Sequence, residues 1–143
     1  MDFDQATWAL AESHIEGRRL LIRFREFVPA FPRELFPERI NIFWTMEAPD
    51  EAGLASDDEA TALKEFEDRL VDAVEPANHS VLAIAMTTGG MREWVFHTAD
   101  VNGFVERLTN MPQNEVRYPI EIRRHHDPQW HYDDLVLENA AGL

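Results

Sequence analysis

The side chains best suited to chemistry form a histidine cluster near the C-terminal end of the sequence. His125, His126 and Asp127 are consecutive, and His131 follows shortly after them. Imidazole and carboxylate groups are common metal ligands, but neighbouring side chains of an extended chain point to opposite sides. At most one of the two adjacent histidines can therefore join the third, which leaves His126 and His131 as the metal candidates. Polar residues at the end of an edge strand are the simpler interpretation, so we predict no metal site.

A second candidate group lies on an alternating stretch in the middle of the chain. Glu93 and His97 are four residues apart and share one face of a strand, so they could cooperate in proton transfer. A general base at His97 would also need a substrate pocket beside it. Pairing of Arg92 or Glu93 with a neighbouring strand is the simpler expectation, with Trp94 and Phe96 in the core. We therefore assign no catalytic residue.

The stretch Thr87-Thr88-Gly89-Gly90 resembles a phosphate-binding loop only superficially. Such loops join a strand to a helix and carry a lysine, whereas this one joins two strand-forming runs and has none. A tight hairpin turn with positive φ accounts for both glycines. We therefore predict a β-hairpin over 80–98 and no cofactor.

The elements that position these residues follow from hydrophobic periodicity. Alternation predicts an N-terminal hairpin over about 7–26, a strand over 40–46, the central hairpin, and a last strand over 117–124. Apolar residues spaced three and four apart predict helices over about 56–74 and 100–109. The tail after Pro128 is either a short helix or an extended cover.

Three local details of the sequence predict specific structural features. Ser56 and Glu59 match a capping box, in which each side chain bonds the backbone N–H at the other residue. Gly103 weakens the second helix by roughly 1 kcal/mol relative to alanine. In the last strand, Pro119 favours an edge position, and we expect Ile122 to face inward beside Tyr118 and Ile120.

This order of elements predicts one α+β domain over residues 1–143. From the third strand onward the order is βαββαβ, which suggests a ferredoxin-like sandwich with two helices on one face of an antiparallel sheet. The N-terminal hairpin would extend or cover that sheet.

The net charge of the chain limits the classes of partner that we expect it to bind. The 27 acidic and 13 basic residues give a formal net charge of −14, and Lys64 is the single lysine. A surface of this sign repels phosphate, so nucleic acids and anionic membranes are not expected partners, whereas a basic protein would be attracted. No cysteine, signal-peptide pattern or long apolar run is present, so we expect a cytoplasmic location.

Several motifs together resemble a known bacterial family. They include Thr7-Trp8, Leu20 to Arg25, the strand ending in Trp44, Glu67-Asp68, Thr87 to Phe96 with Arg92-Glu93-Trp94, and Asp127-Pro128-Gln129-Trp130. On these residues the chain resembles the family known as domain of unknown function 695. His97 is a departure, since relatives usually carry tyrosine there. The resemblance implies membership of this family, and it implies no activity because the family has no established one. A more distant analogy of fold and charge links it to the regulator of ribonuclease activity B, an acidic protein that restrains ribonuclease E.

These observations lead to three hypotheses about function. The first is a non-enzymatic interaction or regulatory module that binds a basic protein through acidic residues of the first helix, with Glu65, Asp68 and Asp72 as candidates. The second is a small enzyme or ligand-binding domain with a site near Glu93, His97 and His126. The third is a homodimer formed by pairing of exposed sheet edges. Acidity also favours solubility by itself, whatever the partner.

Overall fold

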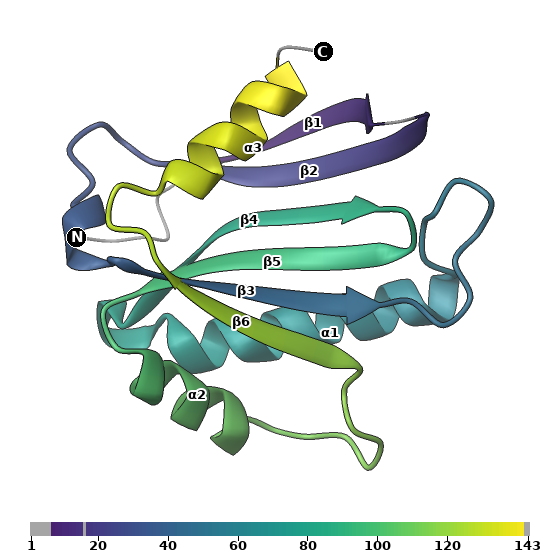
Figure 1. Ribbon diagram of the computed structural model, residues 1–143. Coiled ribbons are helices and arrows are strands. Elements are labelled where there is room, and N and C mark those ends of the chain that lie inside the picture. The colour runs from purple at the N-terminus through teal and green to yellow at the C-terminus, as the bar shows by residue number, and fades with distance from the viewer. Residues whose placement is uncertain (1–6, 16, 142–143) are drawn as a thin grey trace.

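The computed structural model describes residues 7–15 and 17–141 and has the α+β architecture predicted from the sequence. Six strands form one antiparallel sheet, and three helices pack on it (Figure 1). The strands are β1 (Thr7–Ile15), β2 (Arg18–Glu26), β3 (Glu38–Thr45), β4 (Ser80–Thr88), β5 (Met91–Thr98) and β6 (Ile120–His126). The helices are α1 (Asp57–Val74), α2 (Val101–Asn110) and α3 (His131–Ala141), with short 3-10 helices at Arg33–Leu35 and Pro76–Asn78.

The strand order across the sheet is β1-β2-β4-β5-β3-β6. The N-terminal hairpin thus extends the sheet beside β4 rather than covering it. The edge position predicted for the last strand is confirmed, because β6 pairs with β3 and lies last in the order of the described strands. From β3 to β6 the element order is βαββαβ, and these four strands lie in the order β4-β5-β3-β6 in the sheet.

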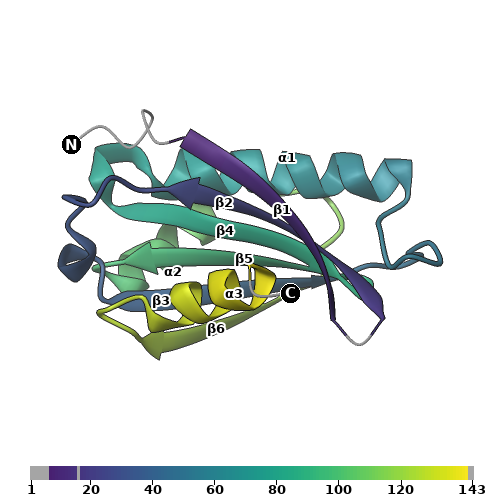
Figure 2. The same cartoon turned by 90° about the horizontal axis from the view of Figure 1, so that it is seen from above.

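The helices divide between the two faces of the sheet. α1 and α2 lie on one face, as predicted, and α3 lies alone on the other, so the undecided tail is helical (Figures 1 and 2). Each face has its own core. Trp94 and Phe96 of β5 are fully buried together with Phe66 of α1 on the α1 and α2 face, whereas Ile22, Val95 and Trp130 are buried on the α3 face. The core positions predicted for Trp94 and Phe96 are therefore confirmed.

The central hairpin forms at the predicted glycines. Gly89 and Gly90 have φ angles of 56° and 79°, and Thr88 pairs with Met91 across the two-residue loop. Positive φ at both loop residues matches the right-handed twist of the flanking strands, and glycine adopts it without a steric penalty.

Two local predictions were wrong in part. The Ser56 hydroxyl does accept a hydrogen bond from the N–H of Glu59, at 3.3 Å, but Glu59 does not return it. Its carboxylate instead accepts the Trp44 indole N–H at 3.0 Å, which ties α1 to β3. The last strand begins at Ile120, and Ile122 is 38% exposed although it pairs with the buried Ile42. None of the described helices has both the length and the apolar character needed to cross a membrane.

Candidate functional site

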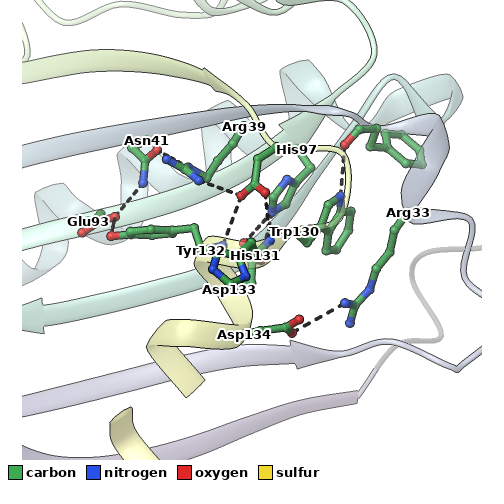
Figure 3. A network of polar contacts seen from close by, with 12 residues as sticks. Arg33, Arg39, Asn41, Glu93, His97, Trp130, His131, Tyr132, Asp133 and Asp134 are labelled. Carbon is green, nitrogen blue, oxygen red and sulfur yellow. Dashed lines mark hydrogen bonds and ion pairs between the residues drawn. The ribbon is translucent and has the colours of Figure 1, made fainter. Parts of the chain in front are cut away.

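His97 lies beneath α3 and is fully buried. Its Nε2 is 2.9 Å from both carboxylate oxygens of Asp133, and its ring stacks on Trp130 with centroids 3.9 Å apart and planes 7° from parallel (Figure 3). The carboxylate only accepts, so Nε2 carries the hydrogen. The other ring nitrogen, Nδ1, is buried and has no hydrogen-bond partner among the described residues. A ring enclosed in this way fastens α3 to the sheet and cannot reach a substrate while α3 stays in place.

Glu93 lies on the same face of β5, closer to the central turn. Its Oε2 accepts hydrogen bonds from Asn41 Nδ2 at 2.8 Å and from the Tyr132 hydroxyl at 2.6 Å (Figure 3). Burial raises the pKa of Glu93, and these two donors and the nearby Arg39 offset that effect only in part. Burial and the Glu93 acceptor also raise the pKa of Tyr132, so its hydroxyl stays protonated and donates.

Asp127 completes the network at the start of α3. Its carboxylate accepts the backbone N–H groups of His131 and Tyr132 at 2.9 and 3.2 Å, and forms an ion pair with Arg39 at 2.6 Å. Burial by itself would raise the pKa of Asp127, but these donors outweigh it and the pKa is lowered. Arg39 also donates to Asn41 Oδ1 at 2.8 Å, which links this end of the network to Glu93.

We call this network the α3 dock. It comprises Arg39, Asn41, Glu93, His97, Asp127, Tyr132 and Asp133. Within it, each carboxylate accepts hydrogen bonds from side-chain or backbone donors of the chain itself. Buried polar groups satisfied in this way specify one packing arrangement, so the dock is best explained as the attachment of α3 to the sheet.

The structure separates the residues of the predicted enzyme site. In the sheet, Arg39 pairs with His97 on one side and with His125 on the other, so His125 shares the α3 face. His126 therefore points to the opposite face, where its Nδ1 lies 3.1 Å from Glu38 Oε1. His126 does not join Glu93 and His97.

The two metal candidates are also apart. His131 is exposed at the first position of α3, away from the Glu38 contact of His126. Within residues 7–15 and 17–141, no three histidine or acidic side chains come together as a metal site.

Sequence reasoning missed Arg39, Asn41, Tyr132 and Asp133 as members of one cluster. For Arg39 and Asn41 the sequence held a local signal of a polar cluster, because these two polar residues alternate with apolar neighbours on a central strand. For Tyr132 and Asp133 no such signal existed, since the tail had no assigned conformation.

The acidic candidates on α1 lie where the sequence placed them. Glu65, Asp68 and Asp72 are all exposed on the outer side of the helix. Glu65 pairs with Arg69, and Asp68 lies 3.1 Å from Lys64, but Asp72 has no ion pair among the described residues. Both pairs are spaced four residues apart on the surface, so they are weak and leave the carboxylates open to other cations.

Comparison with known proteins gives the family and no function. No curated protein matches the chain, and no solved structure matches it. The sequence model of a family described as "Family of unknown function (DUF695)" matches residues 6–135. This range contains both predicted signatures, Arg92-Glu93-Trp94 on β5 and Asp127-Pro128-Gln129-Trp130 before α3, and most of the chain. The protein therefore belongs to the DUF695 family.

Proposed function

We propose that this protein is a non-enzymatic interaction module that binds a basic protein partner through the outer face of α1. The proposal rests on the contrast between buried side chains of catalytic type and exposed acidic side chains on α1. The groups with catalytic potential, above all His97 and Glu93, are held by other side chains in the α3 dock. The carboxylates of Glu65, Asp68 and Asp72 are instead exposed on a single helix face.

The balance of charge supports the same conclusion. The chain has 27 acidic and 13 basic residues, and α1 itself has seven acidic and two basic ones, so the net field of the protein is negative. Such a field accelerates encounter with a positive surface and opposes encounter with phosphate backbones. We include a cytoplasmic location in the proposal, because a chain without cysteine suits a reducing compartment.

The alternative of an enzyme or ligand site at Glu93, His97 and His126 has less support. It requires three side chains to converge, and the sheet register places His126 on the face opposite to His97. It also requires access to a ring that is 0% exposed.

The proposal is tested by capture of partners with matched charge variants. Immobilised protein is exposed to an extract of its own cells at low salt and eluted at rising salt, and each captured protein is purified and titrated. The test variant Glu65→Gln, Asp68→Asn, Asp72→Asn removes three charges from α1. The control variant Glu51→Gln, Glu115→Gln, Glu138→Gln removes three exposed charges elsewhere that form no ion pair among the described residues.

We expect a basic partner whose affinity falls at least tenfold in the α1 variant and much less in the control, and which is released as salt screens the charges. Equal weakening by both variants would show that overall charge, and not the α1 face, attracts the partner. Absence of any basic partner at low salt would contradict the proposal as a whole.

A further inference from the structure

Arg92 is a cation without a counterion among the described residues. It is partly buried on β5, and its Nε donates to the Thr87 hydroxyl oxygen at 2.6 Å. No carboxylate lies within ion-pair distance of it among residues 7–15 and 17–141, whereas Arg23, Arg25 and Arg39 each have one. Burial lowers the pKa of Arg92, and the nearby Arg23 acts in the same direction.

The carboxylate that attracts Arg92, that of Glu67, already accepts hydrogen bonds from other residues. Glu67 attracts Arg92 from a distance, but its Oε1 accepts both the Arg23 guanidinium and the Trp94 indole N–H. A guanidinium has five N–H donors, and only one of those of Arg92 is used by the described residues. A partly buried charge left in this state has much to gain from an anion.

Arg92 lines a hollow of about 390 Å³ on the α1 face of the sheet, over strands β1, β2, β4 and β5. Cross-strand pairing explains its shape. One row of side chains runs Leu10, Arg23, Ala85, and the next runs Glu12, Leu21, Thr87, Arg92. The small side chain of Ala85 leaves room between the rows, and Leu10, on the edge strand, is 82% exposed beside it.

The chemistry of the lining selects the ligand. Arg23 is paired with Glu67, and Glu12 is paired with Arg19, so Arg92 supplies the one uncompensated charge among the described residues that line the hollow. A single positive charge suits a monoanion better than a phosphate dianion. The planar guanidinium matches a carboxylate with two parallel hydrogen bonds, and the Thr87 hydroxyl hydrogen can add a third. Leu10, Leu21 and Ala85 offer apolar surface to a short tail.

We propose that this hollow binds a small monocarboxylate with a short apolar tail, with Arg92 and Thr87 holding the carboxylate and Leu10 and Leu21 covering the tail. The site lies apart from the α3 dock, which is on the other face of the sheet. It does not depend on the proposed basic partner.

Sodium hexanoate is the probe for this site. The labelled protein is titrated at constant ionic strength while amide and arginine Nε–H signals are followed by NMR. We expect saturable shifts on β2, β4 and β5 that include the Arg92 Nε–H signal. Acetate, which shares the head group but lacks the tail, should bind at least about tenfold more weakly. Hexylammonium, which shares the tail but carries the opposite charge, should produce no saturable shift at these strands.

Two pairs of variants locate the site. Arg92→Gln should weaken hexanoate binding by about tenfold or more, because it removes a charge-assisted double hydrogen bond. Arg123→Gln, on the exposed edge strand β6, removes the same charge and should leave binding unchanged. Leu10→Glu, at an exposed position, should fold normally and repel the anion, whereas Leu35→Glu, exposed in a distant 3-10 helix, should not.

Undiminished hexanoate binding by either Arg92→Gln or Leu10→Glu would overturn the proposal. So would shifts that do not saturate, or equal binding of hexylammonium. Because Leu10 is solvent-exposed, its variant keeps the test decisive even if the Arg92 variant does not fold.

Discussion

Glu93 illustrates how residues of catalytic type are used structurally in this protein. Sequence spacing placed Glu93 and His97 on one strand face, and the structure confirms that shared face. Each is then bonded by a different residue of α3, Glu93 by Tyr132 and His97 by Asp133. The two side chains thus act as separate attachment points for the helix rather than as a pair.

The raised pKa of Glu93 predicts a specific pH dependence of stability. Its usual value is 4.5, and burial raises it in the folded state. Between the unfolded and folded values the folded state binds more protons, so the free energy of unfolding falls as pH rises through that window. Glu93→Gln keeps an oxygen for Asn41 and Tyr132 but cannot titrate. We therefore expect the variant to gain stability relative to the wild type as pH rises from about 4 to 7.

Urea unfolding at a series of pH values measures this difference. Glu115→Gln is the control, because Glu115 is exposed and its change should give a difference that is nearly independent of pH. A wild-type-to-Glu93→Gln difference that is the same at pH 4 and at pH 7 would show that Glu93 does not titrate as described.

At the scale of elements, the start of α3 is held by residues outside the helix more than by residues within it. Asp127 accepts the first two N–H groups of the helix, which have no partner within it. Trp130 turns the chain into α3 with a φ of 57°, unusual for a residue other than glycine, and its indole N–H donates to Phe36 O at 3.0 Å. Packing of Trp130 on His97 holds this turn in place.

Removal of the Asp127 carboxylate should therefore release α3. Asp127→Ala leaves Arg39 unpaired, with only 13% of its side chain exposed, and leaves two helix N–H groups without acceptors. We expect a loss of about 3 kcal/mol in the free energy of unfolding, measured with urea, and faster hydrogen exchange in α3 than in β4. Glu121→Ala breaks an exposed ion pair with Arg123 and should change stability by less than about 1 kcal/mol. Equal losses in the two variants would contradict this role of Asp127.

A glycine inside α2 shows why propensity alone did not decide that element. A Cβ on Gly103 would lie 2.4 Å from Asp100 Oδ2 and 2.6 Å from His79 Nε2. Asp100 caps α2 by accepting the Gly103 N–H, and the close approach of His79 leaves no room for a side chain. The low helix propensity of glycine is thus offset by a cap that requires it.

At the scale of the whole molecule, the edge strands of the sheet favour self-association and the net charge opposes it. Among the described residues, β1 and β6 are the edge strands of the sheet, and an edge strand can pair with a strand of a second copy. The net charge of −14 drives copies apart. A homodimer through a sheet edge therefore remains a prediction that depends on ionic strength.

We expect the protein to be monomeric at low salt and to associate more as salt screens the repulsion. Light scattering at several protein concentrations and at two salt concentrations measures this. Leu10→Lys on the edge strand β1 should reduce association, and Leu35→Lys, outside the sheet, should not. A dimer that weakens as salt rises would instead indicate an interface held by opposite charges.

The sequence by itself determined the features that depend on near neighbours along the chain. The Gly89-Gly90 turn, the buried stripe of α1, the cap at Ser56, the edge position of β6 and the excess of acidic residues all follow from local residue chemistry. The family signatures were also visible at this level.

Only the tertiary structure decided which side chains meet. The register that pairs Arg39 with both His97 and His125 excluded His126 from their face, and the place of α3 buried His97. The pairing of the strands also placed Arg92 in a hollow where no described carboxylate forms an ion pair with it. These outcomes depend on pairing between strands far apart in sequence, which hydrophobic periodicity does not encode, because a one-residue change of register would send each side chain to the other face.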